Sequence, residues 1–382
     1  MKRTKIIFII IVFFTITSNS NILFAKNKKH LYHKYDGKIN TPNIFLDFYN
    51  NINSSILIQD KNCISHGSDF YNDTNLSVLG KVNNKTDFFI SKKLKHPEQY
   101  EEQNYYLFDL AYLKHKLNDK FNLIIGKQPI PLGSTESSNS DDEKSDTYIY
   151  SDLYKIKTHP IGIDFVFLPV KNHKFQLQIA NNININRKDG STIPTLGGTI
   201  NWNWKKDLME NKWSYSIFKE NEKNKFWKLL ALGSKLNLKP IIVEGNYIFS
   251  EEDIEKNGEL TNILQNYHDK IPSTKFGTYI LKLKYNFSPK WNVFAKGSYE
   301  IGIYKNKEKV MQDDQEHVLL KSNQLFKKSY TYGGGIEFFP SNENLSVNLA
   351  YQNRIDNYPI YKKENKNEHF ILLGMNYRMK IK

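Results

Sequence analysis

The chain of 382 residues offers few side chains whose types and spacing could support catalysis. His30 and His33 lie three residues apart, but they lack the Glu and the helical context of a zinc-protease motif. Cys63, in a polar loop, is followed by His66, yet no carboxylate that could orient a Cys–His pair is identifiable. Ser68 is not surrounded by the turn residues of a nucleophile elbow. The sequence therefore predicts no catalytic residue, no metal site and no cofactor.

Two further features narrow the chemistry. A single cysteine excludes a disulfide framework and any site built from several cysteine ligands. Gly333–Gly335 is not followed by Lys-Ser or Lys-Thr, so this run is no phosphate-binding loop, and close approach of strands or loops explains it better. Charged side chains are the remaining candidates, and their role depends on the elements that carry them.

The N-terminus indicates that the chain is exported. Met1–Lys5 is positively charged, and Ile6–Phe14 is an unbroken run of nine apolar residues. Leu23–Ala25 ends in a small residue before Lys26, with Ser18–Ser20 as a second cleavage option. We therefore expect residues 1–25 to be a removed signal peptide, although a retained membrane anchor is an alternative. The net charge of +14 is then no sign of a nucleic-acid partner.

Apolar and polar residues alternate with period two along most of the remaining chain, which is typical of strands with one apolar face. In Thr278–Phe287, for example, Tyr279, Leu281 and Leu283 alternate with Lys282 and Lys284. Most segments are about as long as a tilted strand that crosses a bilayer. Sixteen segments share the pattern, at residues 43–59, 71–83, 85–96, 105–117, 120–131, 158–168, 173–183, 197–205, 213–220, 225–237, 240–250, 274–287, 290–303, 329–339, 344–354 and 369–381.

The connections between these segments alternate in length. Short ones lie at 118–119, 169–172, 238–239, 288–289 and 340–343, and long polar ones at 132–157, 184–196, 251–273, 305–328 and 355–368. The pattern blurs only near 206–212 and 221–224, where the lengths are similar. In an antiparallel meander this alternation places the long loops at one end, as transmembrane barrels do. We therefore predict an all-β, transmembrane, antiparallel up-and-down barrel of about 16 strands, with a secreted soluble β-protein as the alternative.

Aromatic residues support the barrel. They make up 14% of the chain, and hydrophobic residues only 39%. Tyr285, Phe287 and Trp291 bracket one short turn, and Trp204 and Trp213 bracket another. Aromatic rings at strand ends suit the headgroup region of a membrane, and a polar lumen explains the shortage of aliphatic residues.

Several segments resemble the phosphate-selective O and P family of outer-membrane porins. They are Gly126–Gly133, which reads Gly-Lys-Gln-Pro-Ile-Pro-Leu-Gly, and the closing segments Tyr332–Pro340, Asn344–Tyr351 and Leu373–Met379. The resemblance implies a 16-stranded barrel in the outer membrane of a Gram-negative bacterium. It also implies a homotrimer that conducts small hydrophilic solutes or ions passively, in contact with outer-membrane lipid.

Two departures limit what the resemblance implies. Phosphate-selecting members use arginine-rich linings, whereas this chain contains four arginines: Arg3, Arg187, Arg354 and Arg378. Phosphate selectivity is therefore in doubt. Many barrels also end on an aromatic residue that the barrel assembly machinery recognises. This chain ends Met379-Lys-Ile-Lys382, so Tyr377 is the candidate for that role.

The predicted organisation is a signal peptide at 1–25, a periplasmic N-terminal stretch at 26–42 and a barrel at 43–382, with a constriction loop inserted near 132–157. This loop is long and acidic, and either folds into the lumen, where its charges would face basic wall residues, or stays outside as a solvated loop. Its candidate residues are Glu136, Asp141, Asp142, Glu143 and Asp146.

Strand alternation assigns further charged side chains to the lumen, although a register error of one residue would reverse a strand's faces. The basic candidates are Lys81, Lys282, Lys284, Lys296, Arg354 and Arg378, and the acidic ones are Asp109, Asp164, Glu244, Glu300 and Glu337. The two signs almost balance. Loop carboxylates inside the pore would favour cations, and their absence would leave a slight preference for anions.

The function that the sequence predicts is a porin for passive diffusion, without a chemical step. A non-conducting receptor or adhesin barrel that uses its long external loops is the main alternative. An outer-membrane hydrolase is a third hypothesis, although such barrels are smaller and carry a Ser/His pair near the lipid face. Strand number and an open lumen would separate the porin from both.

Overall fold

The computed structural model describes residues 44–59, 62–64, 73–94, 108–136, 160–181, 196–219, 225–253, 255, 260, 272–305, 322–340, 345–359 and 366–381. The chain divides into two compact units, Met1–Thr41 and Pro42–Lys382, and all described residues lie in the second. The expected signal peptide and periplasmic stretch fall outside the described residues, so this division of the chain stays a prediction. No helix in the described ranges is long and apolar enough to span a membrane.

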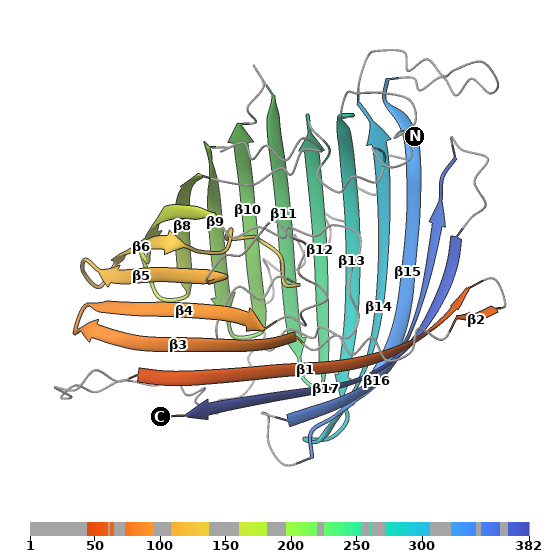
Figure 1. Ribbon diagram of the computed structural model, residues 1–382, viewed down its shortest axis with the longest axis horizontal. Coiled ribbons are helices and arrows are strands. Elements are labelled where there is room, and N and C mark those ends of the chain that lie inside the picture. The colour runs from red at the N-terminus through yellow and green to blue at the C-terminus, as the bar shows by residue number, and fades with distance from the viewer. Residues whose placement is uncertain are drawn as a thin grey trace. The chain divides into compact units, whose positions relative to one another are not determined.

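Seventeen antiparallel strands make up the described part of the chain (Figure 1). They are β1 (Ile44–Gln59), β2 (Asn62–Ile64), β3 (Asp73–Asn83), β4 (Thr86–Leu94), β5 (Leu110–Lys116), β6 (Phe121–Lys127), β7 (Ile161–Phe167), β8 (His173–Asn181), β9 (Leu196–Lys206), β10 (Met209–Lys219), β11 (Phe226–Leu238), β12 (Ile241–Glu252), β13 (Thr274–Asn286), β14 (Trp291–Tyr304), β15 (Gln324–Phe338), β16 (Leu345–Asn357) and β17 (Lys366–Ile381).

The strands form one ring of pairings. From β3 to β17 each strand pairs with its neighbours in sequence, as in an up-and-down meander. β1 pairs with β3 on one side and with β17 on the other, so the succession of pairings returns to its first strand (Figure 1). The three-residue strand β2 pairs with β1. Without β2 the ring has sixteen strands, which confirms the predicted barrel class.

The two faces of the sheet reverse the burial pattern of a soluble protein. On β13, Leu281 is 54% exposed whereas its neighbour Lys282 is 6% exposed. The same alternation runs along β14, where Asn292, Lys296 and Glu300 are buried between exposed or half-buried apolar residues. A contiguous exposed apolar surface with polar side chains inside is the arrangement of a barrel in lipid. We call the side that carries Lys282 the inner face and the other the outer face.

Short turns join the strands at one end of the barrel, and polar side chains close them. The Asn118 side chain accepts hydrogen bonds from the backbone of Lys120 and Phe121 at 2.8 and 2.9 Å. The Ser288 hydroxyl accepts one from the Trp291 backbone at 3.1 Å. Such local bonds are why Asn and Ser favour turns.

Some strand boundaries differ from the prediction. β10 begins at Met209 rather than at 213, after a two-residue turn in which Asp207 has φ 40°. The sequence pattern did not show which of the two connections of β10 is the short one. In the structure the short one is the turn before β10, and the connection after it comprises residues 220–225. β15 begins at Gln324 rather than at 329. In both cases polar and charged residues interrupt the apolar alternation at the start of the strand, and the sequence pattern alone read these stretches as loop. Cys63, expected in a loop, lies in β2.

Aromatic side chains on the outer face gather at two levels, near the short turns and again about eight residues further along the strands. Near the short turns, Phe121 stacks on Phe167 with ring centroids 4.7 Å apart, and Trp291 stacks on Phe338 at 4.3 Å. Further toward the long connections, four tyrosines near the middle of consecutive strands form what we call the tyrosine row: Tyr247, Tyr279, Tyr299 and Tyr330, with centroids 4.8, 6.4 and 4.9 Å apart. Two aromatic belts of this kind mark the membrane interfaces of a barrel.

Candidate functional site

The chain enters the barrel interior directly after β6. We call residues Gln128–Glu136 the inward segment (Figure 1). Pro129 and Pro131 have no backbone N–H for a strand ladder, so regular pairing stops at Lys127. Their carbonyl oxygens instead accept hydrogen bonds from inner-face amides, from Gln178 on β8 at 3.0 Å and from Asn201 on β9 at 3.2 Å.

The segment then crosses β10 and reaches β12. The Gly133 backbone N–H donates to the Ser214 hydroxyl at 2.8 Å. A Cβ on Gly133 would lie only 2.3 Å from the Ser214 backbone nitrogen, so only glycine allows this approach to the wall. The Asn246 side-chain oxygen accepts hydrogen bonds from Ser134 at 3.1 Å and from the Thr135 backbone and hydroxyl at 2.8 and 3.0 Å.

Glu136 ends the described part of the segment in an ion pair. Its carboxylate lies 2.6 Å from the Lys296 ammonium on β14, and the Lys296 side chain is 5% exposed. Lys282 on β13 lies opposite Lys296 in the strand register. The segment therefore spans the inner face from β6 to β14, and its one described carboxylate meets a basic wall residue. The other acidic loop candidates, Asp141, Asp142, Glu143 and Asp146, fall outside the described residues.

An apolar cluster on the inner face holds the segment in place. Its members come from the inward segment, from β10–β15 and from the connection after β12: Ile130, Phe218, Trp227, Leu229, Leu260, Phe276, Tyr304 and Phe326, with Leu132 and Ile248 against them. We call this set the inner apolar cluster. Alternation alone did not reveal it, because the inner face was expected to be polar throughout. Aromatic residues on both faces of the same strand, such as Phe276 and Tyr279 on β13, were the available signal.

Several predicted pore residues form buried ion pairs between neighbouring or nearby strands. Glu300 on β14 lies 3.1 Å from Lys327 on β15, with both side chains 0% exposed, and accepts a hydrogen bond from Thr278 at 2.8 Å. Glu337 lies 2.8 Å from the Lys284 ammonium. Opposite charges that satisfy each other are the usual condition for burying ions.

The remaining wall candidates have different surroundings. Glu244 lies 3.3 Å from the Lys235 ammonium, and Asp164 accepts a hydrogen bond from Gln176. Arg354 donates to Asp356 at 2.9 Å within its own strand. Three candidates remain. Lys81 faces Asp87 in the strand register, Asp109 lies next to the start of β5, and Arg378 is half-buried on β17.

Sequence reasoning missed a group of basic residues near the short turns. Lys174 on β8 is close enough to Lys114 on β5, Lys212 on β10 and Asp164 to interact with them electrostatically. Lys212 also lies 3.2 Å from Glu210. We call Lys114, Lys174 and Lys212 the inner lysine group. The signal was their position on the polar face of each strand, but Lys212 fell in a stretch read as loop. In the described ranges no group of His, Cys, Asp and Glu is arranged to hold a metal ion.

Comparison with known proteins assigns the chain to a family. Residues 58–379 match the family described as phosphate-selective porin O and P, which covers most of the chain. The chain belongs to the phosphate-selective porin O and P family. It is therefore a porin, an outer-membrane channel through which solutes diffuse passively. Family membership indicates a channel rather than an enzyme.

Solved structures agree on the fold. The porin resembles OmpT of Vibrio cholerae in its trimer form (TM-score 0.56, 10% identity, 89% of this chain and 100% of that chain). It resembles the outer membrane channel DcaP of Acinetobacter baumannii (0.56, 11%, 88% and 97%) and an anion-selective porin from Comamonas acidovorans (0.55, 8%, 89% and 100%). No curated protein sequence matches the chain.

Proposed function

We propose that this porin conducts small hydrophilic solutes or ions with a preference for anions, past a constriction formed by the inward segment. The observation that carries the constriction is the course of Gln128–Glu136 along the inner face from β6 to the ion pair with Lys296 on β14. A chain segment held inside a ring of sixteen strands narrows the water-filled cross-section, and its charges act at close quarters on a permeating ion.

The preference for anions rests on how the inner carboxylates are paired. Glu136, Glu244 and Glu300 each lie within 3.3 Å of a lysine ammonium. Their charge is therefore largely neutralised at short range. The inner lysine group, in contrast, sets three ammonium groups against two carboxylates, because Lys114, Lys212 and Asp164 all lie near Lys174 and Glu210 lies 3.2 Å from Lys212. A net positive inner wall attracts anions into the channel and raises their local concentration.

Pore-lining roles follow for the predicted set. We propose that Lys81, Asp109, Asp164, Glu244, Lys282, Lys284, Lys296, Glu300, Glu337, Arg354 and Arg378 line the lumen, and that Glu136, Asp141, Asp142, Glu143 and Asp146 belong to the constriction loop. An arginine ladder for phosphate is not part of the proposal, because Arg354 and Arg378 are the only arginines among the described residues.

The assembly and export of the porin are proposed with it. The signal peptide at 1–25 is removed on export, and residues 26–42 precede the barrel in the periplasm. Tyr377 on β17 serves the barrel assembly machinery as the terminal aromatic residue. The mature protein is a homotrimer in contact with outer-membrane lipid, and a solved trimer form of the similar OmpT of Vibrio cholerae supports this state.

The proposal is tested by planar-bilayer recordings of the purified, folded protein under a KCl gradient. We expect large ohmic steps and a reversal potential on the anion-selective side. Replacing the inner lysine group by Lys114→Gln, Lys174→Gln and Lys212→Gln should lower the anion-to-cation permeability ratio by at least about twofold, because fixed positive charge then leaves the wall.

The matched control removes three exposed lysines of the short turns, by Lys171→Gln, Lys239→Gln and Lys290→Gln. This short-turn variant should change the permeability ratio less than the inner variant does. A cation-selective wild type, or equal effects of the two variants, would contradict the anion preference. Silence from demonstrably folded protein would contradict conduction itself and favour the receptor or adhesin barrel.

A further inference from the structure

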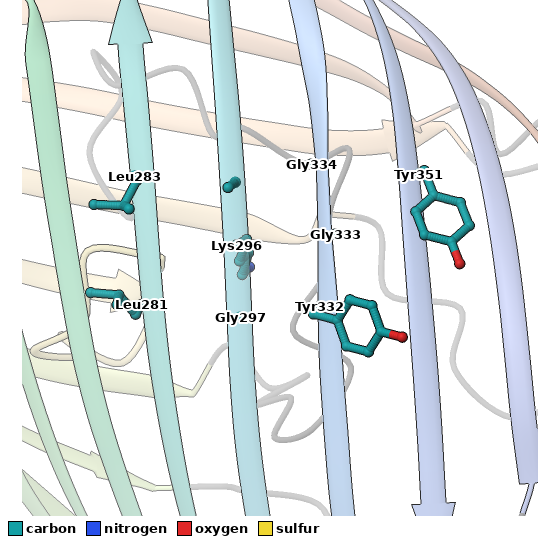
Figure 2. A pocket seen from close by; sticks show the side chains of 9 residues that line it. Leu281, Leu283, Lys296, Gly297, Tyr332, Gly333, Gly334 and Tyr351 are labelled. Atoms are coloured by element: carbon teal, nitrogen blue, oxygen red, sulfur yellow. The ribbon is translucent and has the colours of Figure 1, made fainter.

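The outer face of β13–β16 carries an apolar groove (Figure 2). Its volume is about 430 Å³. Leu281 and Leu283 form one wall, and the rings of Tyr332 and Tyr351 form the other. The floor between them consists of small residues and exposed backbone: Ala295, Gly297, Gly333 and Gly334, with the backbone side of Lys296. Because the floor lacks large side chains, the groove is a depression in an otherwise bulky apolar surface.

The groove lies within the apolar band between the two aromatic belts. Leu281 and Leu283 follow Tyr279 of the tyrosine row and precede Tyr285 near the short turn. On β14, Gly297 lies between Trp291 and Tyr299 in the same way. Aromatic belts lie at the membrane interfaces, so the groove faces the hydrocarbon region.

A basic row lies beyond the tyrosine row, toward the long connections. Its members are Lys228, Lys275, Lys305 and Lys328. Lys228 and Lys275 both face Glu251 in the strand register, and Lys328 lies two positions before Tyr330 on the same face of β15.

The basic row carries an excess of positive charge. Lys305 lies 2.6 Å from both Glu251 and Asp253, whereas Lys228 and Lys275 lie 3.7 and 4.0 Å from Glu251. Three ammonium groups therefore share two nearby carboxylates, and Lys328 adds a fourth positive charge to the row. The long connections of such barrels face the outside, so this charge lies at the headgroup level of the outer leaflet.

The separation of the two features is close to the length of one acyl chain. Six residues separate Lys275 from Leu281, and six separate Lys328 from Gly334. Six strand residues span about 20 Å, which is about 15 Å across the membrane at a tilt near 40°. An acyl chain fills half of a hydrocarbon core of about 30 Å, which is also about 15 Å. An acyl chain whose headgroup contacts the basic row would thus reach the groove.

We propose that this face binds a phosphate-bearing lipid of the outer leaflet, with its phosphate at the basic row and an acyl chain in the groove. Charge complementarity selects the headgroup, and the small residues of the floor admit the chain. The site rests on the outer-membrane location of the porin and not on its conduction, so either proposal can fail without the other.

Native mass spectrometry of the purified full-length protein tests the site, with phosphatidic acid as the probe and diacylglycerol of the same acyl chains as the uncharged comparison. We expect phosphatidic acid to bind and diacylglycerol to bind at least about tenfold more weakly. The variant Lys228→Gln, Lys275→Gln, Lys328→Gln should weaken phosphatidic acid binding by about tenfold or more, since each lysine near a membrane surface contributes about fivefold.

A second variant fills the groove. A Cβ on Gly297 meets nothing closer than the Thr331 carbonyl oxygen at 4.0 Å, so Gly297→Leu can fold. It should weaken lipid binding several-fold, whereas the short-turn variant should change binding less than about twofold. Single-channel conductance should stay at the wild-type value in the groove variant.

Four results would overturn the proposal. They are equal binding of diacylglycerol, full displacement of the lipid by millimolar inorganic phosphate, equal losses in the basic-row and short-turn variants, and loss of the oligomer in Gly297→Leu with lipid binding intact. The second would assign the basic row to free phosphate. The last would assign the groove to a neighbouring copy of the chain.

Discussion

The inner and outer faces of β10–β15 differ in which side chains they bury. The inner face buries ion pairs such as Glu300–Lys327 and also contains the inner apolar cluster around Phe276. The outer face exposes its apolar residues and leaves its charges, such as Lys228 and Glu251, at the rim. The difference indicates that packing by protein atoms stabilises the inside of this porin, whereas lipid completes the outside. Variants in matched positions on the two faces test this comparison.

The largest difference in stability loss between the two faces is expected when a lysine charge is removed. Lys327→Met leaves Glu300 without its ammonium partner in a fully buried position, which should destabilise the folded barrel by about 3–5 kcal/mol. Lys228→Met removes an exposed lysine 3.7 Å from Glu251 and should cost less than about 1 kcal/mol. Denaturant unfolding in the presence of lipid vesicles measures both. Equal losses would mean that the inner pair is solvated rather than buried.

Phenylalanines provide the second comparison. Phe276→Ala opens a cavity in the inner apolar cluster and should destabilise the barrel by about 3–5 kcal/mol. Phe165 on the outer face of β7 is 48% exposed, and lipid can fill the space that its removal leaves. Phe165→Ala should therefore cost about 2 kcal/mol or less, the transfer of the ring alone. A larger loss at Phe165, in the same unfolding assay, would indicate that another protein surface covers it.

The smallest effect concerns Lys305, just beyond the end of β14. Burial acts to lower the pKa of Lys305, but hydrogen bonds to Asp253 and Glu251 outweigh it and raise the pKa above its ordinary value of 10.5. A raised pKa stabilises the folded state below the unfolded pKa, and this stabilisation is lost as pH rises through the folded pKa.

Lys305→Gln should thus cost less than about 1 kcal/mol at neutral pH, because the pair is partly exposed to solvent. The difference from the wild type should be constant at neutral pH and should shrink as pH rises past 10.5 and through the raised folded pKa. Unfolding at pH 8 and at a series of values above pH 10.5 measures this directly. A difference that stays constant across the alkaline series would mean that the side chain acts by packing rather than by charge.

Much of the fold could be predicted because membrane strands carry a local signal. Each of the sixteen expected segments overlaps one long strand, and the faces of Leu281 and Lys282 follow from alternation. Boundaries failed where polar and charged residues break the apolar alternation at the start of a strand, as after Met209 and Gln324. Some of these residues are buried, such as Lys327 beside Glu300. The backbone pairing therefore continues where the apolar pattern has stopped.

The candidate site was less predictable. Glu136 was expected in a constriction loop, but its partner Lys296 lies 160 positions further along the chain, and nothing local links them. The inner apolar cluster was missed for the same reason, since Ile130, Leu260 and Phe326 come from three separate parts of the sequence. The inner lysine group likewise depends on strands that are distant in sequence.

The sequence by itself determined the strands, the short turns and the apolar face, because each depends on residues a few positions apart, such as a period of two in a strand or an Asn or Ser in a turn. Only the tertiary structure decided which charges meet, where the inward segment lies and which small residues open onto the outer groove. Those contacts join residues far apart in sequence, and closing the ring of strands brings them within reach.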